Sequence, residues 1–224
     1  MNRREFVAST FVGLVSLSES ARVASQGKMI APDLAALADG KRLTLVNRTA
    51  IRLVDGGRTG VRLSAAAGDG MALLPGIELA NGTIELDIRG KDVAQQSFVG
   101  VAFHGLDGSA FDAVYFRPFN FNAADAVSRS HAVQYHSLPT YTWDKLRTEQ
   151  PGKYEQPVNP VPDPNAWFRA RLVIANPRVS VFVADAKTPC LAVELLNGRN
   201  TGSVGLWVGN NSGGDFANLT ITPA

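Results

Sequence analysis

The stretch TIELDIR at residues 83–89 alternates apolar and charged side chains. Ile84, Leu86 and Ile88 fall on one face and the charged residues on the other, because successive side chains of a strand point to opposite faces of a sheet. This period of two predicts a half-buried β-strand and argues against a helix.

The same period recurs along the rest of the chain, mostly bounded by Gly, Asn, Asp or Pro. We expect a hairpin turn at Asn176-Pro177 and a short helix at residues 33–38. About a dozen short strands with no interleaved helices predict an all-β fold, an antiparallel two-sheet β-sandwich. The further predicted strands lie at residues 98–105, 113–117, 132–137, 167–175, 178–184, 203–209 and 216–222.

Length, charge and cysteine content exclude several classes of protein. The chain has 224 residues, and a chain of this size buries roughly 70% of its unfolded surface without needing disulfides. Its formal net charge of +2 lacks the basic excess that binding to a phosphate backbone requires, so we expect no nucleic-acid partner. The single Cys190 cannot form an intramolecular disulfide or a thiolate zinc site.

The first 25 residues have the features of an export signal. A charged start precedes an apolar run at residues 6–17, and small residues follow. The pair Arg3-Arg4, followed by Glu5 and Phe6, resembles the twin-arginine export motif. The apolar run is too short to form a stable membrane anchor. We therefore expect a periplasmic or secreted protein.

The remaining chain divides into an N-terminal extension with the short helix, residues 26–41, and one sandwich domain, residues 42–224. A proline-rich segment at residues 138–166 interrupts the strand pattern and holds six of the twelve prolines. Proline removes hydrogen-bond donors from a sheet, so this segment predicts a long loop. Its aromatic residues distinguish it from a linker and favour a lid that folds over a sheet face.

The sheet face that points away from the predicted core combines aromatic and polar side chains. Aromatic rings cover the C–H faces of sugars, and Arg, Gln and His form hydrogen bonds with hydroxyl groups. Small residues such as Gly100 would leave room for a ligand. The alternative is an ordinary solvated sheet face. The predicted carbohydrate-binding surface consists of His104, Tyr115, Arg117, Gln134, His136, Arg169, Arg171 and Trp207, with Trp143 from the loop.

These segments together resemble the concanavalin A-like lectin/glucanase jelly roll, near its laminin-G-like and 3-keto-disaccharide hydrolase-like domains in exported bacterial proteins. The resemblance covers residues 42–223 and implies a sandwich with a concave sheet as the ligand face. Since this fold hosts lectins, glycosidases, lyases and inert modules, it does not imply one activity. The segments that carry it include NGTIELDIRG, FVGVAFHG, DAVYFRPFNF, AVQYHS, WFRARLVI, VSVFVADA and GSVGLWVGNNSGGDFANLTIT.

Glucanases of this fold carry the pattern Glu-x-Asp-x-x-Glu on one strand. Here Glu85 and Asp87 match its first two positions, but Gly90 occupies the last. Retaining hydrolysis requires two carboxyl groups about 5–5.5 Å apart, so half of the pattern cannot support it. We therefore interpret Glu85 and Asp87 as solvated strand residues.

Three functional hypotheses follow. The first is a glycoside hydrolase or lyase that uses His104 or His136 as the base and Glu149 or Glu155 as the acid. The second is a domain that binds a carbohydrate or glycoside without cleaving it. The third is a protein-interaction module of the laminin-G type without sugar activity.

A metal site is a separate question. Asn210 and Asp215 lie in a Gly-rich turn, and oxygen atoms in such loops can bind Ca²⁺. The alternative is a turn built from residues that tolerate a positive φ. None of the three hypotheses requires a cofactor.

Overall fold

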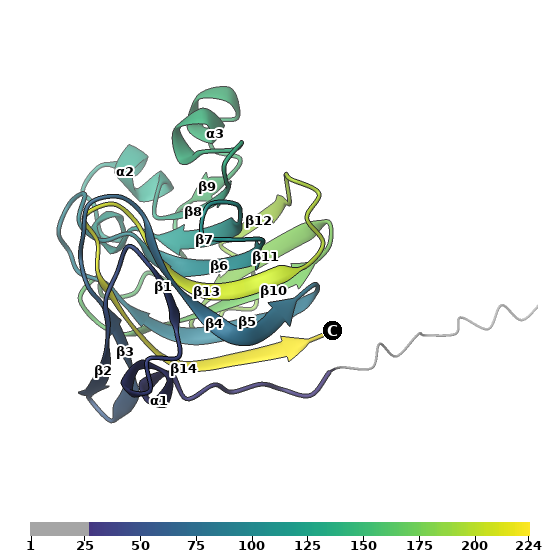
Figure 1. Cartoon of the computed structure of the whole chain (residues 1–224). Helices are drawn as coiled ribbons and strands as arrows, with labels where there is room; N and C mark the ends of the chain where they lie inside the picture. Colours follow the sequence, from purple (N-terminus) through teal and green to yellow (C-terminus); the bar gives the residue numbers. More distant parts are fainter. Residues whose placement is uncertain (1–26) are drawn as a thin grey trace, which may run out of the picture.

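The computed structural model describes residues 27–224, so the expected export signal lies outside the described residues. Two seven-stranded antiparallel sheets pack face to face, which confirms the predicted β-sandwich (Figure 1). The first sheet has the order β1 (Thr44–Val46), β4 (Gly70–Leu79), β13 (Gly202–Val208), β6 (Val99–Gly105), β7 (Asp112–Phe116), β8 (Val133–Ser137) and β9 (Glu155–Gln156). The second has the order β12 (Leu191–Glu194), β11 (Arg178–Val183), β10 (Phe168–Ala175), β5 (Gly82–Arg89), β14 (Gly214–Pro223), β3 (Arg58–Leu63) and β2 (Ala50–Asp55).

All eight predicted strands occur, with ends within two residues of those expected. The hairpin at Asn176-Pro177 is also confirmed, because Ala175 pairs with Arg178 across it. The expected short helix is α1 (Leu34–Asp39), which begins where the side chain of Asp33 accepts a 2.9 Å hydrogen bond from the amide of Ala36. Such a cap satisfies one of the amide groups left open at a helix start.

The core lies between the two sheets and takes apolar side chains from both. Ile84, Leu86 and Ile88 of β5 are fully buried in it, on the face that their alternation predicts. Val133 and Tyr135 of β8 enter the same core from the opposite sheet. No helix within residues 27–224 is both long enough and apolar enough to span a bilayer.

Strand β10 lies in the second sheet, where it pairs with β5 and β11, and not in one sheet with the other strands of the predicted surface. Arg169 and Arg171 therefore belong to the opposite side of the sandwich from the other predicted sugar-binding residues. Alternation assigns a side chain to a face of a strand but does not say which sheet contains the strand. The assignment of these two arginines to the binding surface was wrong.

On that opposite side, Arg169 and Arg171 each lie 3.9 Å from the carboxylate of Glu85. Asp87 is buried, and it accepts hydrogen bonds from Arg58 at 2.8 Å and Asn218 at 2.7 Å. The interpretation of Asp87 as a solvated residue is therefore wrong. Both carboxylates serve ion pairs of the second sheet.

The proline-rich segment at residues 138–166 contains more regular structure than a loop. It includes α3 (Trp143–Glu149) and β9, whose residues Glu155 and Gln156 pair with β8 and extend the first sheet. In Figure 1, α3 stands beyond β8 and β9 at one edge of the sandwich. Two further short helical segments, η1 (Pro118–Asn120) and α2 (Ala126–Ser130), connect β7 to β8.

Gly100 of β6 allows the neighbouring strand β7 to approach closely. A Cβ atom at this position would lie 2.1 Å from the carbonyl oxygen of Val114 and 2.7 Å from the Cβ of Tyr115. We expect Gly100→Ala to lower the free energy of unfolding by about 1–3 kcal/mol, because the backbone of β7 must shift. Urea denaturation followed by tryptophan fluorescence measures the change. Gly205→Ala is the control, since its Cβ would meet only side chains, at 3.0 Å. Equal losses of stability in the two variants would show that the close approach of the β7 backbone to Gly100 is not the cause.

Candidate functional site

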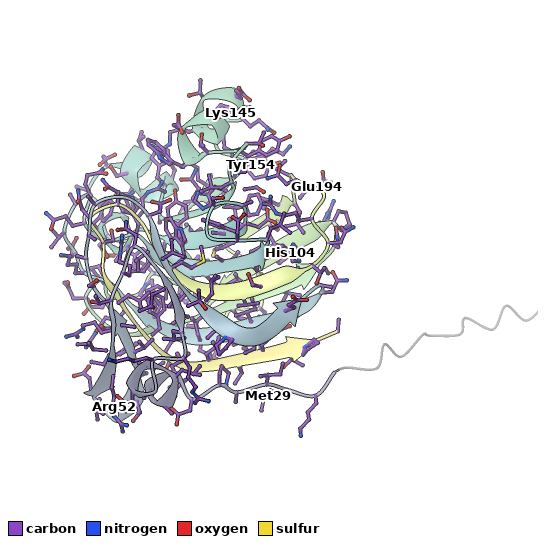
Figure 2. The ribbon with its side chains drawn as sticks, in the orientation of Figure 1. Met29, Arg52, His104, Lys145, Tyr154 and Glu194 are labelled. Carbon is purple, nitrogen blue, oxygen red and sulfur yellow. The ribbon has the colours of Figure 1, made fainter. Side chains whose placement is uncertain are left out.

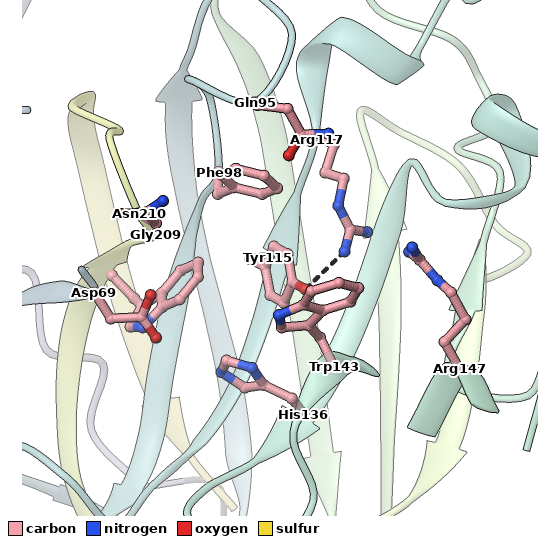
Figure 3. A pocket seen from close by; sticks show the side chains of 11 residues that line it. Asp69, Gln95, Phe98, Tyr115, Arg117, His136, Trp143, Arg147, Gly209 and Asn210 are labelled. Atoms are coloured by element: carbon pink, nitrogen blue, oxygen red, sulfur yellow. Dashed lines mark hydrogen bonds between the residues drawn. The ribbon is translucent and has the colours of Figure 1, made fainter. Parts of the chain in front are cut away.

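A cavity of about 200 Å³ lies on the outer face of the first sheet, with Trp143 and Arg147 of α3 at one side of it (Figure 3). Strands β7, β8 and β13 supply its floor, and α3 and the chain segments at the ends of β4, β6 and β13 supply its walls. Its lining consists of Asp69, Gln95, Phe98, Tyr115, Arg117, His136, Trp143, Arg147, Trp207, Gly209 and Asn210.

Three rings from three strands form the floor of the cavity. The ring centre of Tyr115 lies 4.8 Å from that of Trp207 and 5.2 Å from that of His136. His136 and Trp207 meet edge to face at 5.3 Å. The predicted orientation of all three away from the core is confirmed, but each is at most 3% exposed. The residues around them cover this face, so it is not an open, solvated surface.

Arg117 and Gln134 connect the floor to α3. Arg117 donates a 2.8 Å hydrogen bond to the hydroxyl of Tyr115 and also bonds to the side-chain oxygen of Gln134. The Tyr115 hydroxyl donates to the same oxygen at 2.7 Å, and burial raises the pKa of Tyr115 to about 12, so this proton is retained at neutral pH. Gln134 in turn donates to the backbone oxygen of Trp143 at 3.2 Å. Gln134 therefore positions α3 and does not line the cavity.

The proline-rich segment reaches this sheet face through Trp143 and Arg147 of α3, which line the cavity. These residues lie four positions apart, so they share one face of α3, and the guanidinium carbon of Arg147 lies 5.1 Å from the Trp143 ring centre. Glu155 of β9 fixes Arg147 through bonds of 2.9 and 2.7 Å. The Trp143 side chain is 48% exposed, which leaves its ring available to a ligand.

The carboxylates proposed as catalytic acids lie outside the cavity. Glu149 is exposed on α3, and the buried Glu155 is held by Arg147 and by His131, whose Nδ1 lies 2.9 Å from Oε1. Within residues 27–224, Asp69 is the one carboxylate that lines the cavity. The structure therefore does not assemble His136 with either predicted acid.

His104 occupies a different place from the one predicted. It is fully buried, with Nε2 2.8 Å from the backbone oxygen of Ala80 and Nδ1 3.6 Å from a carboxylate oxygen of Asp112. Figure 2 shows it at the end of β6, far from Lys145 on α3. Alternation fails here because His104 has a left-handed backbone, with φ of 50°, and because the pairing of β6 with β13 shifts register nearby. Its assignment to the cavity face was wrong.

The two residues considered for Ca²⁺ do not converge. Asp215 lies on β14 of the second sheet, where Arg62 and Arg89 bind its two oxygens at 2.6 and 2.7 Å. Asn210 lies at the cavity and accepts a 2.7 Å bond from the amide of Gly68. Across the part of the chain that the structure describes, no three His, Cys, Asp or Glu side chains are grouped to hold a metal. Asn211 has a φ of 56°, as expected for the turn alternative.

Several lining residues were absent from the predicted surface. Phe98 could have been included, because it shares the outward face of its predicted strand with Gly100. Arg147 could have been found from its spacing to Trp143, had the segment been recognised as helical. Asp69 and Gln95 lie in connections between strands, where there is no alternation from which the orientation of a side chain could be predicted.

Two buried polar atoms of the floor have no hydrogen-bond partner among the described residues, namely Nε2 of His136 and Nε1 of Trp207. Buried polar atoms are nearly always paired with protein, ordered water or a ligand, so a water molecule or a ligand group is the expected partner of these two. Three further buried nitrogens without a hydrogen-bond partner in the described part of the chain, on His104, His131 and Arg199, lie outside the cavity lining. Burial lowers the pKa of His136 to about 3, with a further contribution from the charge of Arg117, so the imidazole is neutral at neutral pH. A neutral imidazole has one donor and one acceptor nitrogen, and indole is a donor only. Hydroxyl groups, which both donate and accept, are suitable partners.

No protein-family model matches the chain, and no curated protein matches it. Solved structures do. The carbohydrate-binding module CBM66 from Bacillus subtilis is 16% identical, with a TM-score of 0.56 over 80% of this chain and 94% of the module. A Bacillus subtilis protein of unknown function with a galectin-like fold is 11% identical, with a TM-score of 0.54 over 88% and 96%. The VIP36 exoplasmic/lumenal domain in its Ca²⁺/Man-bound form is 8% identical, with a TM-score of 0.50 over 80% and 82%. These likenesses define the fold as a lectin-like, concanavalin A-like β-sandwich.

Proposed function

We propose that the protein binds carbohydrate in the cavity between the first sheet and α3. The observation that carries this proposal is a cavity with the Trp143 ring in its wall and the rings of Tyr115 and Trp207 in its floor, where two polar atoms lack a partner among the described residues. Rings would cover the C–H faces of a sugar while hydroxyl groups satisfy His136 and Trp207. The carbohydrate-binding module and the mannose-bound VIP36 domain, similar in fold, support the same class of ligand.

The size of the cavity favours a small ligand. At about 200 Å³, it is smaller than the roughly 300–1,000 Å³ pockets that hold drug-sized molecules. One sugar unit would enter, with Asp69 and Asn210 at the rim available to its outer hydroxyl groups. The rest of a longer glycan would extend into solvent.

We propose binding without cleavage. Hydrolysis of a glycoside generally uses two carboxyl groups on either side of the bond, whereas Asp69 is the one carboxylate at this cavity among the described residues. A histidine with a pKa of about 3 is also a weak base at neutral pH. The test is to incubate the protein with the glycan that it binds and to analyse the products. Fragments of the glycan would contradict this part of the proposal.

We also propose that the chain is exported, on the strength of the Arg3-Arg4 motif and the apolar run that follows it. Cell fractionation of the protein and of an Arg3→Lys, Arg4→Lys variant tests this. Accumulation of the variant in the cytoplasm would support twin-arginine export, and unchanged localisation would contradict it.

Trp143→Ala is expected to weaken glycan binding at least tenfold, because it removes an exposed ring from the cavity wall. A glycan array identifies the best ligand, and calorimetric titration measures its affinity for each variant, with CaCl₂ and with EDTA. Trp167→Ala is the matched control, since Trp167 packs on Arg89 of the second sheet, 4.8 Å from its guanidinium carbon.

An unchanged affinity in Trp143→Ala would contradict the proposed site. Equal affinities with CaCl₂ and EDTA would show that sugar binding does not depend on Ca²⁺. Failure to bind any glycan on the array would overturn the proposed function and favour the protein-interaction hypothesis.

A further inference from the structure

The cavity wall beside α3 carries more positive than negative charge. Arg117 and Arg147 both line the cavity, and Glu155 is the carboxylate nearest to both. Asp144 and Glu149 also lie on α3, but both are exposed to solvent, which screens their charges. His131, the other partner of Glu155, adds no charge at neutral pH, because burial lowers the pKa of its imidazole. Two guanidinium groups therefore share one buried carboxylate.

Arg117 is 5% exposed and makes its close contacts with neutral groups only. Nη1 donates to the backbone oxygen of His131 at 2.7 Å, and Nη2 donates to the Tyr115 hydroxyl and to Gln134. The nearest carboxylate oxygen, on Glu155, is 4.0 Å away. A buried cation without its own counter-ion is unfavourable, so this charge attracts an anion.

Arg147 has donor capacity left for such an anion. Its Nε and Nη2 are taken by the two oxygens of Glu155, whereas Nη1 has no partner among residues 27–224. Figure 3 shows the guanidinium groups of Arg117 and Arg147 on one side of the cavity and Asp69 on the other. The acidic and basic groups of the cavity are thus separated, with the rings of Tyr115 and Trp143 between them.

From this arrangement we infer that the ligand is an anionic sugar whose carboxylate or sulfate ester lies beside Arg147 and Arg117, with its hydroxyl groups toward Asp69 and Asn210. The inference rests on the proposed function, since it names the chemistry of the sugar in the same cavity. A single negative charge would give each guanidinium one counter-ion. Hydrogen bonds to ionised groups are about twice as strong as neutral ones, so the anionic group would determine selectivity.

The test compares acidic sugars with matched neutral ones. Calorimetric titrations of the full chain use two pairs. Oligogalacturonate against its carboxyl-reduced form tests a carboxylate, and a carboxyl-reduced chondroitin sulfate oligosaccharide against its desulfated counterpart tests a sulfate ester. We expect at least one acidic form to bind tenfold or more tightly than its neutral partner, with the ratio shrinking as NaCl rises. The pair that shows the preference identifies the anionic group.

Two variants separate charge from structure. Arg147→Gln should reduce the acidic-to-neutral affinity ratio about tenfold, whereas Glu155→Gln should increase it, because the second change removes the competing carboxylate. Both variants break the same ion pair. If Arg147 served only to hold α3, the two changes would move the ratio in the same direction.

The outcomes distinguish this inference from the proposed function. Neutral glycans that bind as tightly as acidic ones, or more tightly, would overturn the inference and leave carbohydrate binding intact. The inference would also be overturned, and carbohydrate binding left intact, if neutral glycans of the array bind and none of the acidic probes binds. Failure of every glycan, neutral or acidic, would overturn both.

Discussion

Asp112→Ala is expected to lower the free energy of unfolding by about 3–5 kcal/mol, the usual cost of removing one partner from a buried charged network. Asp112 is 1% exposed and is the first residue of β7. Its carboxylate accepts a 2.6 Å bond from the hydroxyl of Tyr135 and another from Ser137, and Nη2 of Arg199 lies 3.3 Å away. These contacts join β7 and β8 to the segment between β12 and β13.

The charge of Asp112 has a defined pH dependence. Burial alone would raise its pKa, but the nearby imidazole of His104, hydrogen bonds from Ser137 and Tyr135 and the charge of Arg199 outweigh burial and lower it. A lowered folded-state pKa means that the carboxylate stabilises the fold above the unfolded value of about 3.9. That stabilisation is lost as the pH falls through the folded-state pKa. The difference in the free energy of unfolding between wild type and Asp112→Ala should therefore become smaller below about pH 4.

Urea denaturation at pH 7 and at several lower values measures both effects. Asp185→Ala is the control, because Asp185 is exposed in a turn and its loss should change stability by less than about 0.5 kcal/mol. Asp112→Asn keeps an acceptor but removes the charge. Its loss of stability should lie between those of Asp112→Ala and Asp185→Ala. A loss below 1 kcal/mol for Asp112→Ala would show that the network contributes little.

The fold could be predicted because each strand carries its own evidence. The alternation of residues 83–89 corresponds to β5, and the apolar positions of that strand are the ones buried. The assignment of strands to sheets could not be predicted in the same way. Strand β10 has the same alternation as β8, but pairing partners depend on connections that no local period records.

The site was predicted where the backbone is regular and missed where it is not. Tyr115, His136 and Trp207 lie in regularly paired parts of their strands and meet at the cavity. His104 follows the same period, but its left-handed backbone directs it toward Asp112. Gly100 was expected to leave space for a ligand, whereas the space is filled by the backbone of β7. The sequence shows that a glycine leaves space, but it does not show whether a ligand or a neighbouring strand occupies that space.

His136 carries the other large expected effect, a loss of stability in mild acid. The imidazole is enclosed by the rings of Phe111, Tyr115 and Trp207, at 5.9, 5.2 and 5.3 Å between centres. Burial and, to a smaller extent, the charge of Arg117 lower its pKa to about 3, although the charge of Asp112 opposes the shift. The unfolded chain, with a histidine pKa of about 6.5, binds this proton more readily. Stability should therefore decline as the pH falls from about 6.5 toward 3.

The size of this decline follows from the gap between the two pKa values. Integrated over the whole window, a difference of this size corresponds to about 4–5 kcal/mol, of which about 3 kcal/mol would be lost by pH 4. His136→Phe keeps a ring among the other rings and removes the titrating group. Urea denaturation between pH 7.5 and 4 should show a flatter dependence for the variant, while the carboxylates contribute equally to both proteins and cancel in the comparison.

The decisive quantity is the slope of the free energy of unfolding against pH. A Phe that packs poorly would lower this free energy at every pH without changing the slope. His136→Gln provides a second non-titrating side chain and should give the same flattening. Parallel pH dependence in wild type and both variants would mean that the folded protein accepts a proton on His136 as readily as the unfolded chain does. The imidazole would then be open to water, and the unpartnered Nε2 would no longer support a ligand at this position.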